Sequence, residues 1–252
     1  MNENPMKYTA LFAASLLPFM TCADTKESLS IGAGFVLQNS AYADYDDDNR
    51  VIPLVKFENE HFFVDKDGAG YKLFENQQHR VGIAIGVGKE EWDPKNTNRF
   101  RTLDTRHRSI DAGVSYRFQD RIYGQFSAKL STDISDDHNG IRADLGYGYP
   151  YPVTPELMLI PNIHLSYMDS DYANYYYGVS EEESARSGVS AYDTGSALKY
   201  GVGLAAAYRI TEEWSVSAGA NYSWLDSELE DSPLVDDDAE SSVFMGVSYK
   251  FW

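Results

Sequence analysis

The residue pair closest to catalytic chemistry is His164 and Ser166, which a single leucine separates. Residues two apart on a strand project to the same face, so a histidine base and a serine nucleophile could meet there. A lipid-acting hydrolase would need this pair to face lipid. The alternation instead gives the outward face to the apolar residues Ile163 and Leu165. The pattern therefore favours a hydrogen-bonding pair in the interior, and we expect no enzyme activity.

A second cluster, Asp-Asp-His at 136–138, combines carboxylates with a histidine as some outer-membrane proteases do. The next two residues, Asn139 and Gly140, are typical of a turn. A solvated acidic loop accounts for the whole stretch, so the sequence predicts no catalytic site here.

A third cluster has the opening spacing of a calcium loop, with aspartates at 44, 46 and 48. Position six of such a loop should be Gly and position twelve Glu, but this chain has Asn49 and Val55 there. We expect no dedicated metal site and no cofactor. Looser bridging of divalent ions to lipopolysaccharide phosphates and a merely solvated loop are the alternatives.

The elements that would position these residues are strands, and the C-terminal stretch shows the pattern most clearly. Every second residue is apolar, and smaller or more polar residues lie between them on average. The apolar set is Val243, Met245, Val247, Tyr249 and Phe251. This strand is expected to run to the last residue. In water such an end would be an aggregation hazard, whereas in a closed membrane barrel it completes the wall.

The same stretch resembles the C-terminal assembly signal of bacterial outer-membrane barrels. That signal has a glycine followed by two aromatic residues two apart near the chain end. Gly246, Tyr249 and Phe251 match it, and Trp252 adds one residue to the usual pattern. An edge strand of a soluble sandwich is the alternative interpretation of this stretch.

Alternation recurs along the chain from Ser28 onward and predicts about twelve strands, an even number as bacterial barrels require. The connections alternate in length. Long or acidic connections are expected at 39–50, 89–107, 169–195 and 226–241, and short ones at 119–120, 150–156 and 211–213. A soluble sandwich has no reason to sort its connections in this way. The fold class predicted is therefore all-β: a transmembrane, antiparallel, up-and-down β-barrel.

Composition supports the cell outer membrane of a Gram-negative bacterium as the location. The chain has 19 tyrosines, 4 tryptophans and 19 glycines, which suit interfacial aromatic girdles and a lumen of small residues. Residues 1–23 read as a signal peptide, leaving 24–252 as a single barrel domain without cysteine. A net charge of -18 excludes nucleic acid as a partner, since binding it needs a basic surface. Outer-membrane lipid and lipopolysaccharide are the expected surroundings.

Polar residues at inward positions carry charges of both signs, which favours internal ion-pair networks over a selectivity ring of one sign. The candidate lumen residues are Asp111, Arg117, Lys129, Arg142, Asp144 and His164, with Gln125 and Asn162 beside them. Five tyrosines crowd the longest loop, which suggests either an adhesive or plugging loop, or an upper aromatic girdle plus loop packing. They are Tyr172, Tyr175, Tyr176, Tyr177 and Tyr192.

Several stretches spread over the mature chain resemble the MipA/OmpV family of outer-membrane proteins. They are Gly-Ala-Gly-Tyr-Lys-Leu-Phe at 68–74, Tyr-Tyr-Gly-Val-Ser at 176–180, Ser-Gly-Val-Ser-Ala-Tyr at 187–192, the segment 204–217, and Gly-Val-Ser-Tyr-Lys-Phe at 246–251. The resemblance implies an outer-membrane barrel without a catalytic motif. One branch of the family is a scaffold that joins a lytic transglycosylase to a penicillin-binding protein, and another is a surface antigen or adhesin. We therefore expect a non-enzymatic scaffold, with a narrow solute channel or an adhesin as alternatives.

Overall fold

The computed structural model of the protein describes residues 27–44, 48–66 and 68–252. The predicted signal peptide, 1–23, lies outside these residues, as does Asp46 of the calcium-like spacing.

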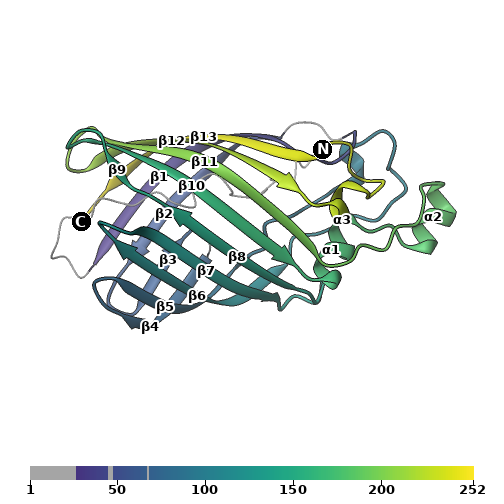
Figure 1. Ribbon diagram of the computed structural model, residues 1–252, viewed down its shortest axis with the longest axis horizontal. Helices are drawn as coiled ribbons and strands as arrows, with labels where there is room; N and C mark the ends of the chain where they lie inside the picture. The colour runs from purple at the N-terminus through teal and green to yellow at the C-terminus, as the bar shows by residue number, and fades with distance from the viewer. Residues whose placement is uncertain (1–26, 45–47, 67) are drawn as a thin grey trace, which may run out of the picture.

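The described chain forms one antiparallel sheet that closes on itself, which confirms the predicted barrel of twelve strands (Figure 1). Each strand of the wall pairs with the next, β10 follows β8, and β13 returns to β1. The two-residue strand β9 pairs only with the start of β10 and is not part of the wall. The strands are β1 (Ser28–Asn39), β2 (Asp48–Glu58), β3 (Phe62–Asp65), β4 (Gly68–Glu75), β5 (His79–Val87), β6 (Ile110–Asp120), β7 (Gly124–Asp133), β8 (Ile141–Gly148), β9 (Tyr151–Pro152), β10 (Leu157–Met168), β11 (Ala197–Arg209), β12 (Trp214–Leu225) and β13 (Ala239–Lys250).

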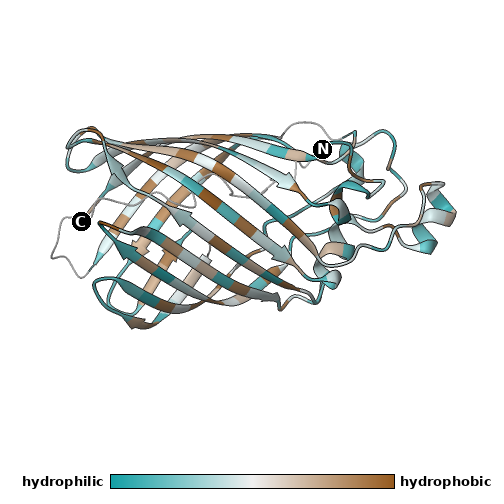
Figure 2. Ribbon diagram, in the orientation of Figure 1, coloured by the Kyte–Doolittle hydropathy of each residue, from teal (hydrophilic) through white to brown (hydrophobic). Residues whose placement is uncertain are grey.

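Side chains alternate between the two faces of the wall, as the period of two requires. Outward positions of β13 such as Val243 and Met245 are exposed, at 45% and 63%, although they are apolar. Figure 2 shows hydrophobic and hydrophilic stretches alternating along the strands. Apolar side chains exposed all round a closed sheet are expected where the surrounding solvent is hydrocarbon.

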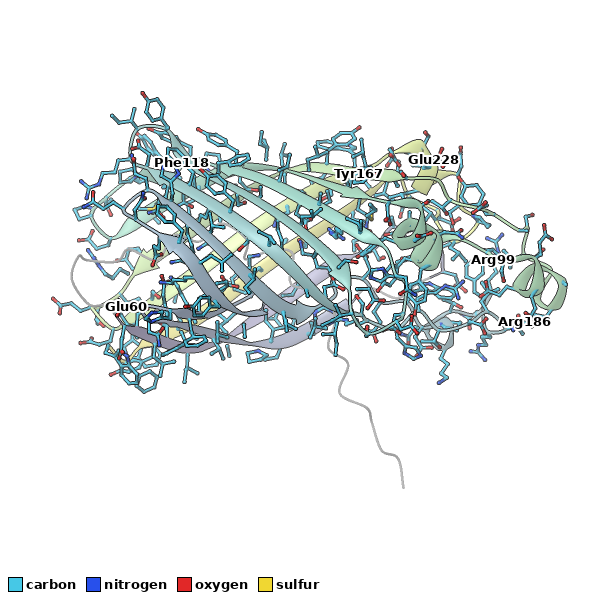
Figure 3. The ribbon with its side chains drawn as sticks, turned by 90° about the horizontal axis from the view of Figure 1, so that it is seen from below. Glu60, Arg99, Phe118, Tyr167, Arg186 and Glu228 are labelled. Atoms are coloured by element: carbon cyan, nitrogen blue, oxygen red, sulfur yellow. The ribbon has the colours of Figure 1, made fainter. Side chains whose placement is uncertain are left out.

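The two ends of the barrel differ in the length of their connections. At one end, here called the loop end, lie the long connections 40–47, 88–109, 134–140, 169–196 and 226–238. The opposite turn end has only short connections, and the C-terminus lies there (Figure 1). Figure 3 shows Arg99, Arg186 and Glu228 at the loop end and Glu60 and Phe118 at the turn end. The predicted alternation of long and short connections is confirmed.

Helices occur only in the loop-end connections of the described chain. They are η1 (Pro94–Asn96), α1 (Ser170–Tyr177), α2 (Glu181–Ser187) and α3 (Ser227–Glu230). The long connection expected at 169–195 thus contains two short helices, α1 and α2, which local caps support. No helix in the described ranges is both long enough and apolar enough to cross a membrane.

Two boundaries also differ from the sequence prediction. The turn expected at 119–120 lies at 121–123, because the Asp120 carboxylate accepts the N–H groups of Ile122 and Tyr123 and Gly124 takes a positive φ of 79°. The last strand ends at Lys250 rather than at the last residue, although Phe251 still donates its N–H to Leu29.

Aromatic residues collect at the turn end, as in the interfacial girdle of a membrane barrel. Trp214 lies opposite Tyr249, and their rings meet edge to face at 5.0 Å. Tyr249 in turn meets Phe251 at 4.9 Å. Such rings have an apolar body and a polar tip, which suits the boundary between lipid and water.

Candidate functional site: the loop cap and the lumenal ion pairs

The largest hydrophobic core of the described residues lies in the connections above the loop end and at the adjoining ends of β10, β11 and β12. It joins four loops that are far apart in the sequence, and we call it the loop cap. Its buried members are Ala41, Tyr42, Ala43, Trp92, Phe100, Leu103, Met168, Tyr172, Ala173, Tyr176, Tyr177, Val179, Ala197, Leu225, Leu229, Leu234 and Val235. Three of the five loop tyrosines are fully buried here. The structure therefore assigns them to loop packing rather than to an exposed adhesive surface.

Ring contacts and burial fix the cap. The ring of Tyr42 stacks on that of Tyr177 with centroids 5.1 Å apart, and Trp92 packs on Phe100 at 6.1 Å. Burial raises the pKa of the Tyr177 and Tyr172 phenols well above 10, so both remain neutral. A neutral, interlocked aromatic core is rigid, unlike a loose surface loop.

Helix caps place the tyrosines in this core. Asp169 begins α1 by accepting the N–H of Tyr172, and its other carboxylate oxygen accepts the N–H of Ile141. Ser180 and Glu183 form a reciprocal capping box at the start of α2. Glu183 also binds Arg106 at 2.9 Å, which ties α2 to the loop 88–109.

The loop 88–109 also reaches down into the lumen with two charged residues. Lys89 pairs with Asp144 of β8 at 3.0 Å. Glu90 pairs with Arg142 of β8 at 3.4 Å and with Lys199 of β11 at 3.2 Å. The pKa of Glu90 is below its usual value. Burial acts to raise this pKa, but the nearby positive charges of Lys199 and Arg142 lower it by more, so the carboxylate stays charged. The loop is thereby attached to two strands of the wall, β8 and β11, which have β10 between them.

Arg142 is the centre of these contacts and is only 2% exposed. Its Nε donates to Asp144 at 3.1 Å and its Nη2 donates to Ser166 at 3.0 Å. Its Nη1 donates to Tyr172 at 3.1 Å, which links the lumen to the core of the loop cap. A guanidinium with partners on three sides holds strand, loop and helix in one arrangement.

Ser166 and His164, the possible catalytic pair, each form a hydrogen bond with a different residue instead of with one another. The Ser166 hydroxyl donates to Asp144 at 2.6 Å, while His164 Nε2 is bonded to the hydroxyl of Ser223 at 2.8 Å. Both line a cavity of about 20 Å³ together with Lys199. Such a volume holds about one water molecule and no lipid. The histidine has no bond to the serine that it would have to activate.

A group of possible metal ligands lies under the loop 134–140. The ligand atoms of Asp111, Asp133 and His138 lie within 4.8 Å of one another, and all three residues are buried. However, His138 Nδ1 accepts the N–H of Gly140, so the proton of the neutral ring is on Nε2, beside Ser109 at 3.2 Å. A metal ion would need that nitrogen free of its proton. The arrangement is therefore better suited to holding the loop than to holding a metal.

Asp133 supports the same interpretation because its carboxylate is fully used by the loop. It accepts the N–H groups of Ser135, Asp137, His138 and Asn139 at 2.6–3.1 Å. Asp44, from the calcium-like spacing, similarly accepts the N–H groups of Asn98 and Arg99. These two backbone bonds lower the pKa of Asp44. Asp133 and Asp44 therefore each hold a loop in place by accepting its backbone N–H groups.

The candidate lumen residues lie in separate places. Arg142 and Asp144 form the pair described above, and Lys129 is opposite Asp144 in the ladder of β7 and β8. Asp111 lies with His138 near the loop end, and Arg117 is 3.7 Å from Asp65 farther down the wall. Of the assembly-signal residues, Gly246 faces inward beneath Leu54, while Tyr249, Phe251 and Trp252 lie at the turn end.

Sequence reasoning missed Glu90, Lys199 and Glu240, of which Lys199 bonds both acids. Lys199 and Glu240 occupy inward positions of strands, so alternation could have found them. Glu90 is in a loop, and no periodic signal could have placed it in the lumen. A second missed cluster lies near the turn end, where Lys72 bonds Glu58 at 2.8 Å and Glu75 at 2.6 Å.

The outer surface of the loop cap carries a cleft of about 730 Å³. Its lining is acidic and aromatic and includes Asp137, Asp171, Glu181, Asp193, Tyr175 and Tyr192. Arg106 also lines it but is paired with Glu183.

Comparison with known proteins places the chain among outer-membrane barrels. The family model described as MltA-interacting protein MipA matches residues 31–251. The MltA-interacting protein of Escherichia coli strain K12 is 32% identical over 91% of this chain and 92% of its own length. The outer membrane protein OmpV of Vibrio cholerae is 28% identical over 77% of this chain and 76% of its own. Among solved structures, the NanC porin covers 88% of this chain and 98% of its own, at 12% identity and a TM-score of 0.44.

Together with the closed antiparallel wall, the outer-membrane relatives locate the protein in the outer membrane, so the loop end faces outward and the turn end faces the periplasm. The resemblance first seen in the sequence is confirmed over most of the chain. The chain belongs to the MltA-interacting protein (MipA) family of outer-membrane proteins.

Proposed function

We propose that this barrel is a non-enzymatic scaffold that holds a lytic transglycosylase, and through it a penicillin-binding protein, at the periplasmic face of the outer membrane. The name of the relative from Escherichia coli supports the first partner, since it describes an interaction with MltA. The family match over residues 31–251 extends that support to nearly the whole barrel.

The observation that carries the proposal is the attachment of the loop 88–109 inside the lumen. Lys89 and Glu90 bind charged residues of β8 and β11 inside the barrel, and the loop cap packs above them. A solute path would have to break several buried ion pairs, each costing several kcal/mol when one partner is left alone. The hydroxyl of Ser166 and the ring of His164 are already bonded elsewhere. A partner protein would then bind at the rim of the barrel.

The periplasmic rim offers an apolar surface for a partner on two neighbouring turns. Ile122 and Tyr123 are 75% and 68% exposed in the turn after β6, and Tyr151 of β9 is 57% exposed. The Tyr147 hydroxyl donates to the carbonyl of Tyr123, which ties the first turn to the end of β8, just before the second turn. Exposed aromatic residues on a supported backbone are typical of protein contact surfaces.

The test is capture of an MltA-type lytic transglycosylase by the tagged, full-length barrel in detergent. Ile122→Glu is expected to lower the amount captured, because it places a charge in the apolar rim. The matched control is Ile134→Glu, since Ile134 is 55% exposed at the opposite, outer end. Both variants must first migrate as folded barrels on unheated gels. If Ile134→Glu lowers capture as much as Ile122→Glu does, the contact lies elsewhere. If the unaltered barrel captures no transglycosylase, the scaffold function is refuted.

The two alternatives predict other readouts. A narrow solute channel requires conductance of the unaltered protein in planar bilayers, which the attached loop disfavours. The acid-lined cleft of about 730 Å³ in the loop cap favours an adhesin as the second candidate. An adhesin requires that intact cells lose attachment to host surfaces when Tyr192, which lines this cleft, is replaced by Ala.

A further inference from the structure

The hydrogen-bonded wall of the barrel is interrupted beside β2. All eleven residues of β2 pair with β1 on one edge. On the other edge, β2 pairs with β3 only at Phe57 and Glu58. The β3–β4 hairpin turns back between Asp65 and Gly68, so in the described ranges no ladder continues along residues 48–56.

This interruption, here called the wall break, lies in the outer half of the barrel. Residues 48–56 correspond to about 30 Å of strand at a rise of about 3.3 Å per residue. A strand tilt of about 40° converts this length to roughly 20 Å of height above the last β2–β3 pair. Phe57 and Glu58 lie near the periplasmic end of β2, and Figure 1 shows β3 and β4 near the same end. The wall break therefore faces the outer leaflet.

An open strand edge in hydrocarbon is costly because its N–H and C=O groups have no water to bind. Addition of another strand would be the usual remedy, but Pro53 is in the middle of this edge. The backbone polar groups of Phe57 point toward β3. Those of every second residue before it, namely Val55, Pro53 and Val51, point toward the same edge. Pro53 thus removes one N–H from the open edge, and proline on an edge blocks pairing with a further strand.

Both faces of β2 are apolar in the middle of the wall break, at 51–55, where the inward residues Arg50 and Lys56 flank the apolar run. The run Val-Ile-Pro-Leu-Val at 51–55 interrupts the alternation of apolar and polar residues. On the outward face Val51 is 74% exposed. On the inward face Ile52 packs with Val36 and Phe244, and Leu54 lies against them. A strand in contact with hydrocarbon on both sides has this composition.

The other side of the wall break also presents apolar and bare backbone surface. Gly70 of β4 and Gly82 of β5 lie under the ring of Phe63, where an added Cβ on Gly70 would be only 2.2 Å from Phe63 Cζ. Phe63 itself is buried. This apolar patch is local, because Lys72 of β4 and Arg80 of β5 pair with Glu58 of β2 beside it.

We propose that the wall break is a lateral binding site for an acyl chain of outer-leaflet lipopolysaccharide. The chain enters between β2 and β4 and lies along the edge of β2 against Ile52 and Leu54. The position in the outer half, the two-sided apolar run and the proline on the edge favour lipid over a second copy of the barrel or a strand from a partner. This site is independent of the scaffold function proposed above.

The test is photo-crosslinking in living cells with benzophenylalanine at three single positions. Leu54 probes the inner face at the wall break. Val247, which faces outward on β13, is the positive control for contact with lipid, and Ser217, which faces inward on the continuous wall of β12, is the negative control. Each variant is first checked for folded migration on unheated gels, and adducts are detected by their mass shift and by an antibody to lipid A.

The Leu54 probe is expected to give a lipopolysaccharide adduct in about tenfold higher yield than the Ser217 probe, the ratio for ~1.4 kcal/mol of additional hydrocarbon contact. A yield at Leu54 no higher than at Ser217, while Val247 is labelled, overturns the site. Equal labelling of all three positions also overturns it, since lipid would then fill the lumen by another route. An adduct of twice the barrel's mass at Leu54 assigns the edge to a second copy instead.

Discussion

Replacement of Arg142 by Met should loosen the loop cap as well as the wall below it. Methionine keeps much of the apolar stem of arginine but removes all five donors. The change leaves the carboxylates of Asp144 and Glu90 without the guanidinium that bonds both, and it removes the donor to Tyr172. These partners belong to a strand, to the loop 88–109 and to α1.

The expected loss of stability follows from the burial of the three charged side chains. The Arg142 side chain is 2% exposed, and those of Glu90 and Asp144 are 11% and 18% exposed. Removal of one partner from a buried ion pair costs about 3–5 kcal/mol, because a charge is left in a poorly solvated place. Lys89 and Lys199 remain as partners for the two acids and favour the lower part of that range. The matched control is Arg186→Met, whose pair with Asp104 is exposed and screened by water, so that its loss should change stability little.

The assay is unfolding by urea in detergent, with the folded fraction read from migration on unheated gels. Proteolysis of the loop 88–109 in the folded barrel gives a second readout. Arg142→Met should shift the unfolding midpoint to lower urea and expose the loop to cleavage, while Arg186→Met should change the midpoint little. If both variants unfold at the same urea concentration, the lumenal pairs do not hold the cap and the reasoning fails.

Three further predictions follow from residues described above. Phe251→Ala should lose at most about 1–3 kcal/mol of apolar burial, yet accumulate poorly in the outer membrane, whereas Val243→Ala should be tolerated; equal membrane abundance of both would show that Phe251 carries no assembly signal. Ser166→Ala should leave the lipid A and phospholipid profiles of cells unchanged, and the disappearance of any hydrolysed lipid would reveal an enzyme. The pKa of Asp44 is depressed in the folded protein, so its carboxylate should accept the N–H of Asn98 at neutral pH and lose this bond only as pH falls through the lowered pKa. The measurement is the chemical shift of the Asn98 amide against pH. A midpoint at or above about 4, the ordinary aspartate value, contradicts this.

Strand positions were largely predictable because one physical rule acts on every residue of a barrel wall. Lipid lies outside and polar groups lie inside, so a period of two is imposed along each strand. The connections expected at 211–213 and 226–241 leave 214–225 between them, and these residues form β12. The rule fails at 51–55, where both faces are apolar, and this is where the wall is interrupted. Turn positions were less secure, since a single side chain such as Asp120 can move a turn by two residues.

The loop residues were the least predictable part of the candidate site. Caps such as Asp169 and the Ser180–Glu183 box have recognisable spacing, but α1 and α2 are short and depend on packing for stability. The five tyrosines left two interpretations open. Only the placement of Tyr172, Tyr176 and Tyr177 against residues from other loops decided between them.

The sequence by itself determined a barrel of twelve strands, its long and short ends, and which strand residues face the lumen, because these depend on a local repeat and on the solvent at each face. It also determined the family, through stretches spread along the chain. The tertiary structure alone decided that Glu90 enters the lumen, that Ser166 bonds Asp144 instead of His164, and that β2 has an open edge. These features join residues that no periodic pattern relates, so they arise only when loops and wall are packed together.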